Sequence, residues 1–591
     1  MGNIRVNPSN PRNPCTTSTW TKTRRLLSSP AETAQEPPES LLYAGRWVAL
    51  VRGKVVAQGA TQQEALLAAR QARRKDRLEI KYMPEMPVKS PLIDRVRALL
   101  PAGLPVYLVG GAVRDAVLGR ETHDLDFATP PGALKLARKL ADKLPGAFFP
   151  LDEQNDTARI VLQNPDGSRD ILDFAGFRGA SLEVDLRGRD FTINAVAMDI
   201  HTGQILDPLR GISDIRAKRI RACAETAFSD DPARILRAVR QAAAFGFSID
   251  PETRKWMKAA VPLLANISPE RQRDELFKML EGPKPDASIR ALELLGVFPV
   301  LLPELPALKG VEQSAPHVHD VWTHTLAVLR HLESILAALA PEYDESKANA
   351  DLFNGLLVLR LGRYREQIGA HLGPTLNSDR SARALLFFAA LYHDVNKPQT
   401  QSSEPNGRIR FLGHDEQGAL TALKRGMALH LSNDELDRLK LLVRHHMRVH
   451  FHTSRKAESA ADPTRKAIYR FFRETGEAGV SLILLALADV RATYDHTLTQ
   501  EYWAANLDVA RALLEAYYEK AEEIIRPPQL INGDDLINDL KMKPGPEIGK
   551  LLEAIRETQA AGKLATRQEA LAFARGWLAT CPEKRGKGHE K

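Results

Sequence analysis

The spacing of apolar residues divides the chain into a mixed α/β stretch and a longer helical stretch. Between residues 92 and about 210, short apolar runs such as 105–111, 123–129 and 169–175 alternate with segments of helical period such as 132–144. This alternation predicts a mixed α/β head. After residue 210 the period stays helical apart from joints rich in Pro and Gly, so we expect an all-α remainder and a multidomain α/β plus all-α fold class.

Changes in pattern and composition predict how the chain is divided. Residues 339–380 show weak periodicity and are expected to be an insertion. The expected segments are a disordered leader (1–40), a small ββαβ module of unassigned chemistry (41–84), the head (92–210), a first helical region (211–310), a second helical domain (311–500) and a helical C-terminal tail (501–591).

Composition and charge narrow the class of protein. A chain of 591 residues is too long for one core, and its net charge of +8 favours a polyanionic partner. The apolar run 481–488 is too short to cross a bilayer, so no membrane partner is expected. Cys15, Cys223 and Cys581 are too scattered for a disulfide framework, which favours a reducing, cytoplasmic location.

Candidate chemistry begins with the stretch LVGGAVRDAVLGRETHDLDFAT at residues 108–129. Asp124 and Asp126 are two positions apart, so on a strand their carboxylates share one face, and Asp173 on a second strand could add a third. Oxygen-only ligation suits Mg²⁺. Gly110 and Gly111 would let backbone N–H groups approach phosphates, helped by the N-terminus of the following helix.

The same stretch resembles the first motif of the class II tRNA nucleotidyltransferase and bacterial poly(A) polymerase family. The later motifs of that family follow in order, as RGRDFTINAVAMD (187–199), DPLRGISDIRAKRIR (207–221), SDDPARILRAVRQAAAFGF (229–247) and ISPERQRDELFKML (267–280). The resemblance implies a mixed-sheet nucleotidyltransferase head with Mg²⁺ on Asp124 and Asp126, supported by Asp173. The residues expected to contact the nucleotide are Gly110, Gly111, Arg114, Asp115, Arg189, Asp190, Asn194, Asp231, Arg234 and Arg237.

Asp231 and Arg234 are the candidates for reading the base. Three positions apart on a helix, they would present a carboxylate and a guanidinium as one edge. Adenine and cytosine both offer an exocyclic amine beside a ring-nitrogen acceptor, which suits this pair, whereas guanine and uracil have the opposite polarity. The sequence departs from the family at Asp230, where Glu is usual, and at Gln241, which we interpret as a packing variation.

A second set of polar residues lies in the helical part of the chain. An apolar helix ends in His393-Asp394, with His324 before it and Asp489 after it. This order resembles the HD phosphohydrolase superfamily, which implies a metal site of these four residues, with Lys397 placed to meet a phosphate. His414, His445 and His446 are candidates for a second metal, so one or two divalent ions are expected. His317, His319, His430 and His450 are interpreted as surface residues.

Together the motifs predict an enzyme that builds or repairs the 3′-terminal CCA of tRNA from CTP and ATP, fused to an HD domain with phosphohydrolase activity. The expected partners are the 3′ acceptor end of tRNA, ATP and CTP. The nearest alternatives are a poly(A) polymerase, or an enzyme of the same family that adds only CC or only A. A further alternative is an HD phosphohydrolase whose head binds RNA without catalysis.

Overall fold

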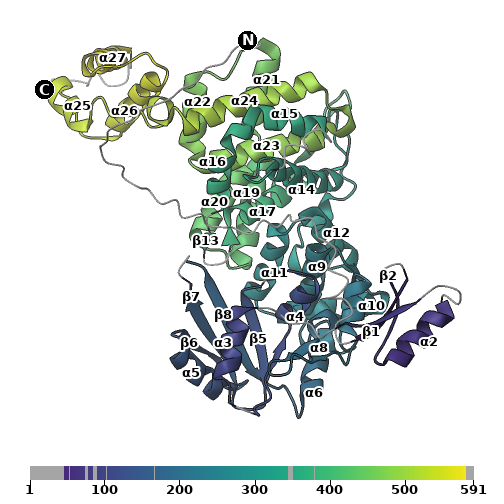
Figure 1. Cartoon of the computed structure of the whole chain (residues 1–591). Coiled ribbons are helices and arrows are strands. Elements are labelled where there is room, and N and C mark those ends of the chain that lie inside the picture. Colours follow the sequence, from purple (N-terminus) through teal and green to yellow (C-terminus); the bar gives the residue numbers. More distant parts are fainter. Residues whose placement is uncertain are drawn as a thin grey trace, which may run out of the picture.

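A computed structural model describes residues 46–51, 54–72, 78–83, 90–101, 103–120, 122–164, 167–343, 351–373, 375–377, 380–459 and 461–580. The head and a stack of helices lie at opposite ends of the molecule, with a smaller helical unit beside the stack (Figure 1). The expected leader at 1–40 lies outside the described residues. Among those described, no helix combines the length and apolar character needed to span a membrane.

The head contains a seven-stranded mixed sheet of strand order β10-β9-β4-β5-β8-β7-β6. The strands are β4 (Tyr107–Val109), β5 (Asp124–Thr129), β6 (Ala147–Asp152), β7 (Thr157–Gln163), β8 (Arg169–Gly176), β9 (Ala197–Asp199) and β10 (Ile205–Leu206). Strands β5 and β8 lie side by side and parallel, whereas β4 pairs antiparallel with β5. The mixed sheet confirms the predicted fold class of the head.

One face of this sheet is apolar and covered by helices. Leu125 and Phe127 of β5 and Leu172 and Phe174 of β8 are buried, because alternate strand residues point to the same face. They pack with the apolar faces of α3 (Pro91–Leu99) and α5 (Ala133–Lys143). The intervening polar residues therefore project from the opposite face of the sheet.

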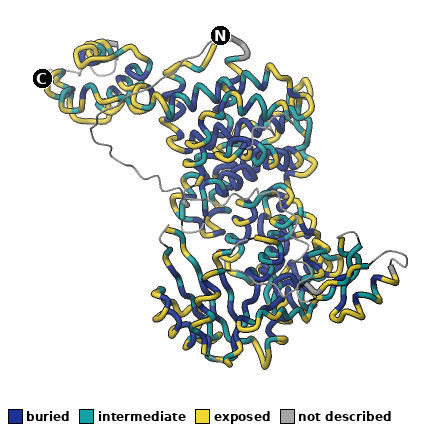
Figure 2. Tube along the Cα trace, in the orientation of Figure 1, coloured by how far each residue is buried: buried dark blue, intermediate teal, exposed yellow. Residues whose placement is uncertain are grey.

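Most of the helices that follow the head sheet share one continuous core. The elements are α7 (Gly211–Arg216), α8 (Ala227–Asp230), α9 (Arg234–Phe245), α10 (Pro251–Ala260), α11 (Pro269–Glu281), α12 (Pro285–Leu295), α14 (Val321–Ala338), α15 (Leu352–Leu361), α16 (Arg365–Leu372), α17 (Ala382–Tyr392), α19 (His414–Ala428), α20 (Asn433–His445), α21 (Arg448–Ser459), α22 (Arg465–Thr475), α23 (Ala478–Tyr494) and α24 (Gln500–Tyr518). Buried residues run along the centre of this stack (Figure 2). The all-α prediction for this part is confirmed apart from short two- and three-residue strands.

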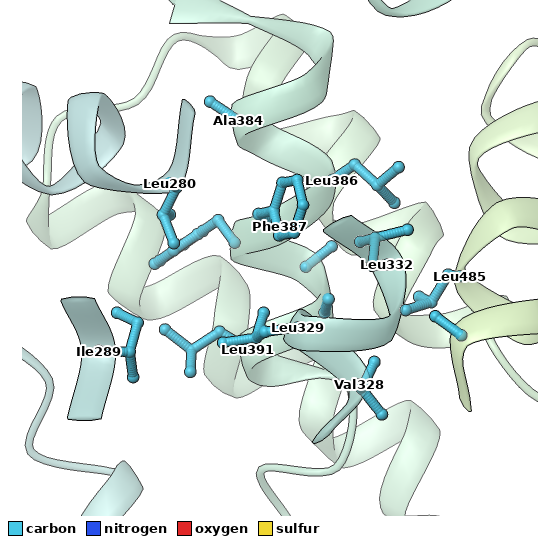
Figure 3. Close-up of a cluster of buried hydrophobic side chains, with 14 of the residues drawn as sticks. Leu280, Ile289, Val328, Leu329, Leu332, Ala384, Leu386, Phe387, Leu391 and Leu485 are labelled. Carbon is cyan, nitrogen blue, oxygen red and sulfur yellow. The ribbon is translucent and has the colours of Figure 1, made fainter. Parts of the chain in front are cut away.

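Figure 3 shows where the two helical regions meet in this core. Leu280 and Ile289 of the first region face Leu329, Phe387 and other side chains of α14 and α17. All are buried. The two regions therefore share one hydrophobic core, and neither can rearrange without disturbing the packing of the other.

One expectation about elements is wrong. The motif 229–247 is not one helix, since α8 ends at Asp230 and α9 begins at Arg234, with Asp231 in an extended conformation between them. Pro232 explains the break, because the residue before a proline is disfavoured in the helical region. The weakly patterned segment 339–380, expected to be an insertion, contains α15 and α16, and Leu361 of α15 and Leu372 of α16 are buried in the shared core.

Two smaller units flank the head and the stack. Residues from Arg46 to Met83 form the predicted hairpin, helix and strand as β1 (Arg46–Val51), β2 (Lys54–Gly59), α2 (Gln62–Ala72) and β3 (Glu79–Met83). The C-terminal unit comprises α25 (Gly533–Leu540), α26 (Pro546–Ala560) and α27 (Arg567–Thr580), with a separate core around Leu536, Leu551 and Ala570.

Candidate active sites

Three carboxylates meet on the polar face of the head sheet. Asp126 of β5 is the register partner of Asp173 of β8, and Asp124 lies two positions before Asp126 on the same strand. Burial raises the pKa of Asp126, and the charges of Asp173 and Asp124 raise it further. Clustered carboxylates of this kind repel one another unless a cation lies between them, and an all-oxygen donor set fits Mg²⁺.

Arg159 of β7 supplies part of the compensating charge. Its Nε and Nη2 each donate to one oxygen of Asp173, both at 2.8 Å. This bidentate contact orients the Asp173 carboxylate and leaves Asp124 and Asp126 as the carboxylates without such a clamp.

Gly110 brings the backbone close to these carboxylates. It precedes α4 (Gly111–Val117) with φ of +72°, and a Cβ there would lie 2.9 Å from Asp126 Oδ2 and 3.3 Å from Arg189 Nη1. A backbone hydrogen bond from Gly111 favours the ionised form of Asp126. The glycine pair therefore gives the first turn of α4 access to the Asp126 carboxylate, and its predicted approach to phosphates stays a prediction.

A cavity of about 440 Å³ opens beside Asp126. Most of the predicted nucleotide residues line it: Gly110, Gly111, Arg114, Arg189, Asp190, Asn194, Asp231, Arg234 and Arg237. Asp115 is not among the lining residues and instead accepts hydrogen bonds from Arg114 Nε and Nη2 at 2.9 and 2.8 Å. Asp124 and Asp173 are also outside the lining set.

Asp190 holds the centre of the polar network in this cavity. Arg237 Nη2 donates to it at 3.0 Å and Asn194 Nδ2 at 2.9 Å. Burial opposes ionisation of Asp190, but the Arg237 charge and the hydrogen bonds from Asn194 and the Phe191 N–H keep its pKa below the usual value. Asp190 is therefore a fixed anion that orients an arginine and an amide toward the cavity.

Asp231 and Arg234 both line the cavity but do not form the expected helical pair. Asp231 accepts from Arg271 Nη2 at 2.8 and 2.9 Å. Arg234 donates from Nη2 to the Gly188 carbonyl at 2.9 Å and from Nη1 to the Arg189 carbonyl at 3.3 Å. Their expected arrangement on one helix is wrong, and each group is oriented by a separate partner.

The sequence-based site omitted five residues that line the cavity, namely Arg178, Arg240, Gln241, Phe245 and Arg271. Gln241 is more than a packing variation, because its Oε1 accepts from Asn194 Nδ2 at 3.1 Å. Arg114 stacks over the ring of Phe245 with its Cζ 4.5 Å from the centroid. Helical spacing offered a signal: positions 234, 237, 241 and 245 repeat at three or four residues along α9.

A second polar cluster is buried where α14, α17, α19, α20 and α23 meet. Two groups of three side chains present ligand atoms close enough to hold a metal ion: His324, His393 and Asp489, and Asp394, His414 and His446. All six residues are buried. Asp394 lies between the groups, with Oδ2 3.1 Å from His393 Nε2 and Oδ1 3.4 Å from His414 Nε2.

Backbone contacts fix the orientation of three of these histidines. The Nδ1 atoms of His393, His414 and His446 each donate to a carbonyl at 2.7 Å. In the neutral ring each Nε2 then carries a lone pair, and the Nε2 atoms of His414 and His446 lie only 3.2 Å apart. Two facing lone pairs need a shared proton or a cation, and this arrangement is common for metal-ligating histidines.

Electrostatics disfavour a proton on His446. Burial, followed by the charges of His414 and His393, holds the pKa of His446 well below its ordinary value. His324 Nε2, His393 Nε2 and Asp394 Oδ2 are buried without a hydrogen-bond partner of suitable geometry. The residues therefore fit one or two divalent ions with mixed N/O ligands.

Three other histidines lie where the sequence did not predict them: His445 is outside the cluster, whereas His450 and His317 are beside it. His445 is half-buried and belongs to neither group, so its place among the candidate ligands is not supported. His450, expected at the surface, lies with Nε2 2.8 Å from Asp489 Oδ2. His317 is also at this site, with its ring centroid 5.3 Å from that of His324.

Lys397 Nζ is 2.6 Å from Asp394 Oδ2, so its charge faces the cluster.

The other two of the four histidines expected at the surface, His319 and His430, pair with carboxylates outside the cluster. His319 Nε2 is 2.6 Å from Asp495 Oδ2, with about a quarter of its side chain exposed, and His430 Nδ1 is 2.6 Å from Glu270 Oε1 with about half exposed. The surface interpretation therefore suits His430 better than His319.

Family models match four consecutive parts of the chain. They are described as "Poly A polymerase head domain" (residues 106–221), "Probable RNA and SrmB- binding site of polymerase A" (246–308), "HD domain" (321–493) and "tRNA nucleotidyltransferase domain 2 putative" (496–574). The first and third contain the two clusters described above.

Solved structures show the same fold. A CCA-adding enzyme in complex with CTP aligns over 83% of this chain and 97% of its own, with a TM-score of 0.55 and 22% identity. The Thermotoga maritima CCA-adding enzyme complexed with tRNA aligns over the same shares with a TM-score of 0.52.

Curated proteins are similar over most of the chain. The CC-adding tRNA nucleotidyltransferase of Thermus thermophilus is 32% identical over 480 residues, which is 80% of this chain and 93% of the relative. The A-adding tRNA nucleotidyltransferase of Deinococcus radiodurans is 31% identical over 80% of this chain and 96% of its own. The chain therefore belongs to the tRNA nucleotidyltransferase family and carries an HD domain within it.

Proposed function

We propose that this protein adds nucleotides of the CCA sequence to the 3′ end of tRNA, using CTP and ATP. The observation that carries the proposal is the shared cavity, which is lined both by Asp126 and by the base-reading candidates Asp231 and Arg234. A triphosphate placed beside Asp126 would extend its base toward Asp231. The same cavity therefore contains Asp126, which faces the phosphates, and Asp231 and Arg234, which select the base.

The reaction follows from these residues. Asp124 and Asp126 would hold Mg²⁺, with Asp173 in support, and the metal supplies Lewis acidity to the α-phosphate and the attacking hydroxyl. The tRNA 3′-hydroxyl gives up its proton to solvent and its oxygen forms a bond to the α-phosphorus. The bond from that phosphorus to the oxygen bridging the α- and β-phosphates breaks, and pyrophosphate leaves. Gly110 and Gly111 provide space and N–H groups for the phosphates, while Arg189, Asp190 and Arg237 contact the ribose and the phosphate chain.

The Asp231 carboxylate and the Arg234 guanidinium, each already oriented by its own partner, select the base. Asp231 retains lone pairs for an exocyclic amine while Arg271 holds its carboxylate. Arg234, anchored on the carbonyls of Gly188 and Arg189, donates to a ring nitrogen. Cytosine and adenine satisfy both groups, and guanine and uracil leave them unpaired at a cost of roughly 1–3 kcal/mol each.

The test is incubation of the purified protein with tRNA that ends before CCA, with Mg²⁺ and each labelled nucleotide alone and together. Addition of C, then C, then A supports the proposal, and no incorporation of C or A contradicts it. Addition of C alone or A alone would support the narrower alternative, which several relatives favour by their names as CC-adding and A-adding enzymes. Long tails of A would indicate a poly(A) polymerase.

The buried histidine and aspartate cluster supports a second activity. We infer that the HD domain is a metal-dependent phosphohydrolase acting on 2′,3′-cyclic phosphates or phosphomonoesters at RNA ends. Six buried ligand groups and the charge of Lys397 beside Asp394 support this inference. The test is release of phosphate, or opening of the ring, from a 2′,3′-cyclic nucleotide with Mn²⁺, Ni²⁺ or Mg²⁺, and no turnover with any of these metals contradicts it.

A further inference from the structure

An aromatic side chain is exposed on the face of the head sheet that carries the carboxylates. Phe149 of β6 pairs in register with Arg159 of β7. Arg159 pairs in turn with Asp173 of β8, and Asp173 pairs with Asp126 of β5. Residues in register across neighbouring strands project from the same face of a sheet. These four side chains therefore form one row that runs from the nucleotide cavity to the edge strand β6 (Figure 1).

Contacts of the neighbouring side chains agree with this direction. Phe148, one position earlier, packs against the apolar core on the other face of the sheet, where Arg138 of α5 lies with its Cζ 5.0 Å from the ring centroid. The side chain of Arg159 meets Asp173 on the carboxylate face. Phe149 therefore projects from the carboxylate face, where it is 48% exposed.

Hydrogen bonds fix the hairpin that holds Phe149. Asp152, at the end of β6, accepts two backbone N–H groups of the turn that follows, each at 3.0 Å. Asp156, just before β7, accepts three backbone N–H groups of residues 132–134 at the start of α5, at 2.6, 2.8 and 2.9 Å. The exposed ring therefore lies on a rigid support at a fixed place relative to the carboxylates.

The strands on the two sides of β5 face different parts of the site. On one side, β4 leads into Gly110, which lines the nucleotide cavity together with Asp126. On the other side lie β8, β7 and β6, and neither Asp173 nor Arg159 is among the residues that line the cavity. In an in-line displacement the attacking oxygen lies opposite the leaving group. A triphosphate in the cavity therefore leaves the outer strands of the sheet to the attacking strand.

We propose that Phe149 stacks on the terminal base of the tRNA acceptor strand and so positions the 3′-hydroxyl of that strand at the carboxylates. The inference rests on the proposed function, because it takes this hydroxyl as the nucleophile. Three strand spacings separate β6 from β5, a total of about 14 Å. A metal ion, the terminal ribose and its base can together bridge this span.

An aromatic ring suits an end whose base changes during the reaction. The tRNA ends in its own last base before the first addition, and in C before the second and third additions. Stacking holds any base, because every base has a π face, whereas hydrogen bonds to the base edge would select one. The head would therefore divide its tasks: Asp231 and Arg234 select the incoming base, and Phe149 holds the outgoing end without selection.

Three substitutions at Phe149 separate stacking from simple apolar contact. Phe149→Ala should lower kcat/KM for tRNA about 5- to 100-fold, the loss expected for one stacked base, and leave the KM for CTP unchanged. Phe149→Leu keeps apolar bulk without a π face and should lose as much, whereas Phe149→Trp should retain wild-type activity. All three should keep the wild-type melting temperature, because the side chain is half exposed. A higher KM for CTP with unchanged kcat/KM for tRNA would place the ring against the incoming base and overturn the inference.

A matched control makes the same change outside the head. Phe451 of α21 is 60% exposed, and Phe451→Ala should keep wild-type kcat/KM for tRNA. The second arm uses a tRNA whose terminal nucleotide lacks its base. Wild type should lose the same factor on this substrate, and Phe149→Ala should lose nothing further, because the two changes remove one contact. Independent, multiplying losses would overturn the inference.

A photocrosslink tests the contact without catalysis. A tRNA that carries 5-iodouridine as its 3′-terminal nucleotide should, on irradiation with the wild type, form an adduct at Phe149 that mass spectrometry locates. Phe149→Leu should abolish this adduct, and an adduct elsewhere that persists in Phe149→Leu would contradict the stack. If the wild type incorporates no nucleotide, the proposed function fails, while the crosslink still shows whether the acceptor end reaches Phe149.

Discussion

Gly110 occupies a position that other residues cannot take without cost. Its φ of +72° is unfavourable for side-chain-bearing residues, and a Cβ would meet Asp126 Oδ2 at 2.9 Å. Gly110→Ala is expected to lower the free energy of unfolding by about 1–3 kcal/mol and to raise the KM for CTP. Gly203→Ala is the matched control, because Gly203 has φ of +75° with no atom within 4 Å of its added Cβ. If both variants keep the wild-type KM, the contact with Asp126 has no role in nucleotide binding.

Asp231 provides a test of base selection. Asp231→Ala removes the acceptor for the exocyclic amine, so kcat/KM for CTP and ATP should fall about 10- to 100-fold, the size of one lost buried hydrogen bond. Incorporation of UTP and GTP should change little, so the ratio of kcat/KM for CTP and ATP to that for UTP and GTP should fall. The neighbouring Asp230→Ala should behave as wild type, since Asp230 is exposed and outside the cavity. Unchanged selectivity in Asp231→Ala would refute the assigned role.

At the residue scale, the prediction succeeded where chemistry is local. Asp124 and Asp126 could be grouped because strand alternation places them on one face, whereas Asp173 joins them only through the parallel pairing of β5 with β8. The pairing of Asp231 with Arg234 failed, because Arg271 on α11 takes the carboxylate from 40 residues away along the chain. No local pattern encodes that tertiary contact.

At the scale of elements, Glu333 of α14 shows how burial makes helix packing depend on pH. Its carboxylate pairs with Arg383 of α17, yet burial raises its pKa from 4.5 to about 7. The folded protein holds a proton that the unfolded chain has released, so this group's stabilisation is present below pH 4.5 and is lost as pH rises through 7.

Glu333→Gln imitates the protonated form and tests this dependence. The variant should match wild type near pH 4.5 and exceed it in free energy of unfolding by up to about 3 kcal/mol at pH 8. Denaturant unfolding at both values measures the difference. Glu183→Gln on α6 (Leu182–Arg187), with more than half of its side chain exposed, should show the same small effect at both. A pH-independent difference for Glu333→Gln would contradict the argument.

Elements were predictable where one pattern dominates. The strands of the head alternate clearly, whereas α17 and α23 are apolar on nearly all sides and are recognised by largely apolar stretches of helical length, 11 and 17 residues. The segment that contains α15 and α16 shows neither signal clearly, because α15 is apolar on most sides and α16 is short. Their helical state follows from burial against the shared core, which sequence periodicity does not report.

At the scale of the whole molecule, α11 and α17 connect the two candidate sites. Arg271 near the start of α11 reaches Asp231 in the nucleotide cavity, while Phe277 farther along α11 packs 5.4 Å from Phe388 of α17. His393 and Asp394 follow the end of α17. The sites are thus joined by packed helices but share no ligand residue, which predicts separate chemistry within one rigid core.

Asp394→Asn tests that separation. Removing the charge between the two ligand groups should lower bound Mn²⁺ by at least one ion per chain, measured by elemental analysis, and abolish hydrolysis of a 2′,3′-cyclic nucleotide. Incorporation of C and A should remain within about two-fold of wild type, because the variant leaves the carboxylates of the head untouched. Asp126→Asn is the reciprocal variant and should lose incorporation while it keeps the metal content of the HD cluster. If Asp394→Asn lost both activities while retaining the wild-type melting temperature, the two sites would have to act as one.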